Sequence, residues 1–97
     1  MNIGVGKVRL RLPENLSLKG KRHVIKPIIA RVASKFSVSV AEVDDQDAWQ
    51  LATIGICTVS NDGRHNNEVL CKIVDFIAAA RFEAEVLDYE IELISVM

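Results

Sequence analysis

Residues 5–36 read VGKVRLRLPENLSLKGKRHVIKPIIARVASKF, and the hydrophobic period changes part-way along this segment. Up to residue 12, apolar and basic residues alternate, which predicts a strand over 5–12 with one buried face and one wet face. The two sets are Val8, Leu10 and Leu12, and Lys7, Arg9 and Arg11. After the break at Pro13, apolar residues recur at helical spacing, which predicts a helix over 18–36 with Ser17 as its N-cap.

The rest of the chain continues this alternation of elements. The pattern predicts strands over 38–43, 51–59 and 85–94, an acidic turn over 44–47, and a second helix after the Asn61–Gly63 turn. On the last strand, Leu87, Tyr89, Ile91 and Leu93 oppose Asp88, Glu90 and Glu92. The order βαββαβ, with two right-handed crossovers, predicts an α+β ferredoxin-like sandwich. We therefore expect one domain over 1–97, with antiparallel strands in the order 4-1-3-2 and both helices on one face.

Pro27 lies inside the first predicted helix, on its solvent side. A proline there removes one backbone hydrogen bond. The sequence therefore predicts a kink near residues 23–27, but no break in the helix.

Composition indicates a small intracellular protein. The chain has 97 residues, 49% of them hydrophobic and only 5% aromatic, so its core is expected to be aliphatic. The two cysteines, at 57 and 71, have neither a zinc spacing nor a CxxC motif, which suits a reducing cytosol. There is no signal-peptide pattern, and no apolar run approaches the roughly 20 residues of a membrane span. We expect a cytoplasmic protein with no membrane segment, metal or cofactor.

Charge is divided by position along the chain. Residues 1–37 hold nine Lys/Arg and one acid, a net charge of +8, whereas residues 38–97 hold three and twelve, a net charge of −9. Such a division predicts either a basic surface for an anionic partner or two halves that neutralise each other within the fold.

The start of the first helix is the main candidate site. Lys19, Arg22 and Lys26 cluster with His23 on its solvent side, and Lys21 falls near the apolar side, from which it is expected to extend to the edge. Cations at a helix N-terminus oppose the helix dipole, so their presence points either to an anion site or to a nearby acidic group. The candidates for binding an anion or nucleic acid are Arg11, Lys19, Lys21, Arg22 and Lys26. The alternative, which the predicted topology favours, is neutralisation by the turn Asp44–Asp47.

The exposed sheet face has its own alternatives. Lys7, Arg9 and Arg11 would neighbour Asp88, Glu90 and Glu92 across strands, which favours pairing over RNA binding. The face lacks the exposed aromatic pair of an RNA-recognition motif. Thr53, Gly55 and Cys57, with Ile3 and Val5, would form a weakly polar strip suited to a homodimer. Trp49 is expected to pack on the loop, with ligand stacking as the alternative.

The chain resembles the YlxP-like family of small bacterial proteins with a ferredoxin-like fold. The likeness lies in residues 17–22 (SLKGKR), 38–43 (VSVAEV), 47–50 (DAWQ), 59–62 (VSND) and 88–92 (DYEIE). Gly20 and Pro27 depart from the family pattern, which has Glu and usually Ser there. The family's activity is unknown, but its genes often lie among those for translation initiation and ribosome-binding factors. The resemblance therefore implies a translation-associated role.

Three functions follow as hypotheses. The first is a non-enzymatic interaction module that associates with RNA or the ribosome through the basic candidates. The second is an ACT-like regulatory domain that binds a small ligand at a homodimer interface, although the loop after the first strand lacks the glycine typical of such sites. The third is an acylphosphatase-like enzyme, which the same loop disfavours because residues 12–16 contain neither glycine nor arginine.

Overall fold

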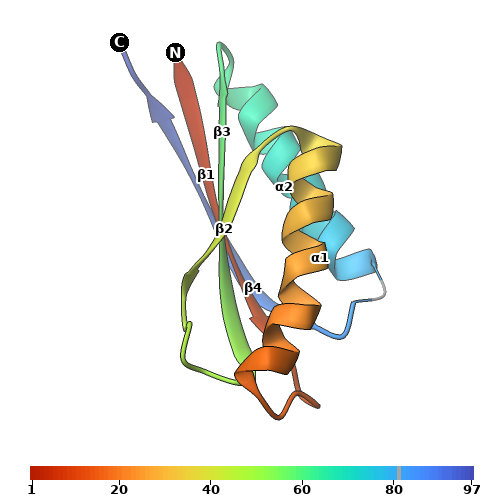
Figure 1. Cartoon of the computed structure of the whole chain (residues 1–97). Coiled ribbons are helices and arrows are strands. Elements are labelled where there is room, and N and C mark those ends of the chain that lie inside the picture. The colour runs from red at the N-terminus through yellow and green to blue at the C-terminus, as the bar shows by residue number, and fades with distance from the viewer. Residues whose placement is uncertain (81) are drawn as a thin grey trace.

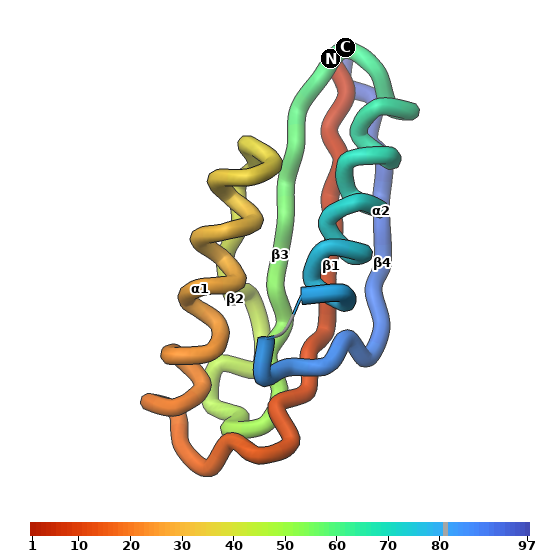
Figure 2. The backbone as a smooth tube through the Cα atoms, turned by 90° about the vertical axis from the view of Figure 1, so that its right-hand side faces the viewer, coloured from red at the N-terminus to blue at the C-terminus, as the bar shows by residue number. Residues whose placement is uncertain are grey.

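The computed structural model describes residues 1–80 and 82–97. The elements follow the chain as β1 (Asn2–Arg11), α1 (Leu18–Phe36), β2 (Ser39–Asp44), β3 (Leu51–Ser60), α2 (Gly63–Ala79) and β4 (Glu85–Ser95). The strands form one antiparallel sheet in the order β2-β3-β1-β4, and both helices lie on the same face of it (Figures 1 and 2). The predicted ferredoxin-like architecture and strand order are confirmed.

The core lies between the sheet and the two helices. Strand β1 contributes the alternate residues Val8 and Leu10, and Leu12 follows just beyond its end. Helix α1 contributes Ile25, Ile28 and Val32, and α2 contributes Leu70, Ile73, Val74 and Ile77. All of these are aliphatic, so the fold is held by branched side chains packed between two layers. No helix in the described part of the chain is long and apolar enough to cross a membrane.

Helix α1 begins and continues as its sequence predicts. The Ser17 hydroxyl accepts a hydrogen bond from the Gly20 N–H at 2.9 Å, which confirms the predicted N-cap. The helix then passes through Pro27 without a break, as predicted. The bend near residues 23–27 stays a prediction.

One strand prediction is wrong in detail. A register shift between Arg9 and Leu10 places Val86 opposite Leu10, and Leu87 is displaced from the ladder. Val86 therefore packs against the core, whereas Leu87 is 46% exposed. A β-bulge inserts one residue into a strand and thereby reverses which side chains face the core on either side of it.

Helix α1 ends on a serine in the left-handed region. Ser37 has φ 53° and ψ 51°, a conformation that glycine adopts without steric cost. We expect Ser37→Gly to raise the free energy of unfolding by about 0.5–1 kcal/mol, measured by urea denaturation. The matched control is Ser34→Gly, an exposed helical position of the same type, which should lower it by about 0.5 kcal/mol. Equal losses in both variants would contradict this account of the helix end.

Candidate nucleic-acid interface

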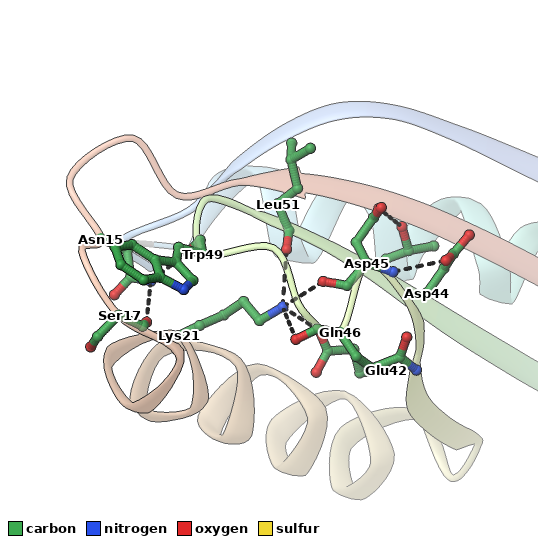
Figure 3. A network of polar contacts seen from close by, with 10 residues as sticks. Asn15, Ser17, Lys21, Glu42, Asp44, Asp45, Gln46, Trp49 and Leu51 are labelled. Atoms are coloured by element: carbon green, nitrogen blue, oxygen red, sulfur yellow. Dashed lines mark hydrogen bonds and ion pairs between the residues drawn. The ribbon is translucent and has the colours of Figure 1, made fainter.

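Lys21 is buried inside the fold, only 2% exposed. Its ammonium group donates hydrogen bonds to three backbone carbonyl oxygens: those of Asp45 at 2.8 Å, Gln46 at 3.2 Å and Leu51 at 3.2 Å (Figure 3). A lysine ammonium has three protons, so these carbonyls account for all of them. The Glu42 carboxylate, with Oε2 2.9 Å from Nζ, balances the charge. Lys21 thus connects α1 to the loop between β2 and β3.

This position corrects two predictions about Lys21. Its ammonium does not extend to the edge of the apolar side, and it has no surface from which to bind an external anion. Its charge partner is Glu42 on β2, not a carboxylate of the acidic turn. Two of those carboxylates make local contacts, because Asp45 accepts a hydrogen bond from the Thr53 hydroxyl of β3 at 2.7 Å and Asp44 accepts one from the Asp45 N–H at 2.8 Å.

The end of the same loop is held at three successive residues. The carbonyl oxygens of residues 49, 50 and 51 accept hydrogen bonds from Asn15 Nδ2 at 2.5 Å, the Leu12 N–H at 2.9 Å and Lys21 Nζ at 3.2 Å, respectively. The three donors lie within residues 12–21, from the end of β1 to the first turns of α1. The side chain of Trp49 nevertheless stays 54% exposed. The loop therefore has a fixed backbone and presents an aromatic side chain to solvent.

Gly20 makes room for one of these donors. A Cβ atom at residue 20 would overlap Asn15 Oδ1, so a larger residue would displace the Asn15 side chain. The Asn15 amide donates to the Ser17 carbonyl at 2.7 Å as well as to that of Trp49. The contacts of Asn15 thus give a structural reason for glycine at position 20.

Trp49 borders a shallow depression of about 580 Å³ at this end of the molecule. Leu16, which is 75% exposed, lies on it two residues before α1 begins. The lining consists of Arg11, Leu16, Ala48, Trp49, Gln50 and Leu51. Arg11 is the single charged residue among them, so the depression combines an aromatic ring, an aliphatic side chain and one cation.

Three of the predicted site residues come together on α1. Lys19, Arg22 and Lys26 are exposed and follow one another at spacings of three and four, which places them along one side of the helix. We call them the α1 cation row. The first turn of α1 contains no acidic residue, and within residues 1–80 and 82–97 no ion pair reaches the row.

Arg11 is separate from the α1 cation row. It alternates with buried Leu10 and Leu12, so it projects from the sheet face that the helices leave open. The structure therefore divides the five predicted residues into the row on α1, Arg11 in the depression and Lys21 in the interior.

The open sheet face carries the predicted cross-strand pairing. Arg9 Nη1 lies 3.1 Å from Asp88 Oδ2, and both side chains are about half exposed, so the pair contributes at most about 1 kcal/mol. Lys7 lies opposite Glu90 and Arg11 opposite Glu85 in the strand register, although neither pair is within ion-pair distance.

The predicted strip on this face is present in part, because Thr53 is buried and donates a hydrogen bond to Asp45. Gly55 and Cys57 lie opposite Lys7 and Val5, so they share the open face, and Val43 covers the site that a Cβ of Gly55 would take. The homodimer through this strip stays a prediction.

Comparison with known proteins identifies the family. The family described as "Protein of unknown function (DUF503)" matches residues 3–91. The chain belongs to this DUF503 family. The DUF503 chain is also 43% identical, over 61 residues, to the "Uncharacterized protein YlxP" of Bacillus subtilis (strain 168). The aligned segment covers 63% of this chain and spans 66% of that protein's length. The predicted resemblance to the YlxP-like family is confirmed.

Proposed function

We propose that this DUF503 protein is a non-enzymatic module that binds RNA, ribosomal RNA included, through phosphate contacts from the α1 cation row. The observation that carries the proposal is the exposure of three cations along one side of the first half of α1, with no ion pair to them among the described residues. Lys19, in the first turn, opposes the helix dipole at a cost of a few tenths of a kcal/mol, whereas Arg22 and Lys26 lie beyond the reach of this effect. A cation placed where the helix dipole disfavours it lowers stability, and such departures from local preference are typical of functional surfaces.

The dimensions of the row suit a nucleic-acid backbone. From Lys19 to Lys26 the helix rises about 10 Å, at about 1.5 Å per residue. Phosphates follow one another at about 3.4 Å along a strand of a duplex, so the row is long enough to face more than one of them. Because the chain's net charge is −1, attraction must come from this local surface and not from the protein as a whole.

A binding role is also favoured over an enzymatic one by how the neighbouring polar groups are used. The Lys21 ammonium, the Glu42 carboxylate and the Asp45 carboxylate all take part in holding the β2–β3 loop. Structural contacts therefore account for these three groups, whereas the α1 cation row is exposed beside His23, and exposed cations bind phosphates by charge.

The test is the salt dependence of RNA binding. We expect a fluorescent single-stranded oligouridylate to bind with an affinity that falls linearly with salt on logarithmic axes. In Lys19→Gln/Arg22→Gln/Lys26→Gln, the slope should fall by about 2, and the affinity at about 50 mM salt by on the order of 10²-fold, because three phosphate contacts are lost.

The matched control removes three exposed cations elsewhere. Lys7→Gln/Arg64→Gln/Lys72→Gln has the same net charge as the first variant and should keep the wild-type slope. If wild-type protein shows no salt-dependent binding, or if both triple variants lose the same slope, the proposed function is wrong.

A further inference from the structure

Trp49 has an unusual combination of exposure and order. Tryptophan is mostly buried in folded proteins, yet this side chain is 54% exposed. Its exposure does not come from a loose loop, because its own carbonyl and the two that follow are held by Asn15, Leu12 and Lys21. A large aromatic ring held at the surface by a rigid backbone can bind a planar ligand with little loss of conformational entropy.

The surroundings of Trp49 indicate what kind of ligand it fits. Among the residues the structure describes, the depression is lined by no acid and by one cation, Arg11. Leu16 extends the depression to the start of α1, so it adjoins the first turn, where Lys19 lies. A planar apolar group next to a negative charge complements this arrangement. A nucleotide has both, and the next phosphates of the strand would continue toward the row.

We propose that Trp49 stacks on one unpaired RNA base in this depression, with Arg11 beside the phosphate of the same nucleotide. This inference rests on the proposed function, because the α1 cation row supplies the remaining phosphate contacts. It also narrows the ligand to single-stranded RNA, since a base within a duplex is already stacked on its neighbours. Aromatic stacking accepts any base, so the site would distinguish single-stranded from double-stranded RNA but not one base sequence from another.

The fluorescence of the protein tests this directly, because Trp49 is its one tryptophan. We expect single-stranded oligoadenylate to quench the emission of Trp49, and adenosine monophosphate to quench it at higher concentration. Inorganic phosphate should leave it unchanged. Trp49→Ala should weaken binding of the oligonucleotide roughly 5–150-fold, the factor equivalent to about 1–3 kcal/mol per stacked base, without a change in salt slope. Trp49→Phe, which keeps an aromatic ring, should lose less.

The control and the salt slope separate the two proposals. Tyr89→Ala removes another half-exposed aromatic ring, on β4, and should bind as wild type does. RNA could bind with the expected salt slope while Trp49→Ala and Trp49→Phe bind like Tyr89→Ala and no quenching occurs. That result would show that the stacking site is wrong but would leave the proposed phosphate contacts of the α1 cation row intact. If RNA does not bind, both proposals are wrong, and quenching by adenosine monophosphate would then indicate a mononucleotide site at Trp49 in place of an RNA site. Thermal unfolding of each variant establishes that it is folded.

Discussion

Lys21→Met is expected to lower the free energy of unfolding by about 2–4 kcal/mol. Methionine fills much the same volume but has no proton to donate, so the carbonyls of Asp45, Gln46 and Leu51 lose a shared donor inside the fold. The Glu42 carboxylate loses its charge partner as well, and its Oε2, which is buried, has no hydrogen-bond partner among the described residues. Urea denaturation of the wild type and the variant measures the difference.

Two further variants separate the carbonyl contacts from the ion pair. Lys19→Met, at an exposed position on the same helix, should change stability by less than about 0.5 kcal/mol. Lys21→Met/Glu42→Leu removes both charges. It is still expected to show most of the loss in unfolding free energy seen in Lys21→Met, because the three carbonyls remain without their donor. A loss in Lys21→Met no larger than in Lys19→Met would contradict the buried role.

Pro27→Ala is expected to change stability in the opposite direction, raising the free energy of unfolding by about 1–3 kcal/mol. Proline in a helix interior costs about 3 kcal/mol relative to alanine, because it cannot donate to the carbonyl four residues earlier, here that of His23. Part of this gain is offset, since alanine gives the unfolded chain more conformational freedom. Pro27 is exposed, so its replacement leaves no core cavity. Thermal and urea denaturation both measure the effect.

The control for Pro27→Ala is a substitution on the same helix that restores no hydrogen bond. Ser34→Ala, also exposed, should raise stability by only a few tenths of a kcal/mol. A neutral or destabilising Pro27→Ala would mean that the proline ring itself is required where it lies.

The fold could be predicted because its signals are periodic. Alternation over residues 5–12 and helical spacing over 18–36 each identify an element and its buried face, and the handedness of crossovers then fixes the strand order. The displaced Leu87 could not be predicted, because the signal for a bulge is one residue long and Val86 and Leu87 are equally apolar.

The site was harder to predict because its main contacts are made to backbone atoms. Helical spacing placed Lys21 near the apolar side, which is correct, but its acceptors are carbonyl oxygens that any residues at 45, 46 and 51 would supply. Glu42 was missed because it lies on the helix-facing side of β2, where an acid is uncommon. The contact at the Trp49 backbone was missed for a related reason, since its carbonyl oxygen accepts a hydrogen bond from Asn15, which is distant in the sequence.

The cations of the basic half of the chain fall into two groups, those paired within the fold and those without a partner among the described residues. Arg9 pairs with Asp88 and Lys21 with Glu42, so part of the basic half is neutralised within the fold. The α1 cation row and Arg11 have no such partner in the part of the chain that the structure describes. Lysines on one helix therefore differ in their surroundings: Lys21 holds the loop, whereas the proposed RNA contacts fall to the exposed Lys19 and Lys26.

Acetylation of the native protein, followed by mass spectrometry of each lysine, tests this division most directly. Without RNA, Lys19 and Lys26 should react readily, and Lys21 should be protected because its ammonium is buried and hydrogen-bonded. Addition of single-stranded RNA should then protect Lys19 and Lys26 and leave Lys72, exposed on α2, as reactive as before. Reaction of Lys21 at the rate of Lys19, or RNA that leaves Lys19 and Lys26 as reactive as Lys72, would contradict the account.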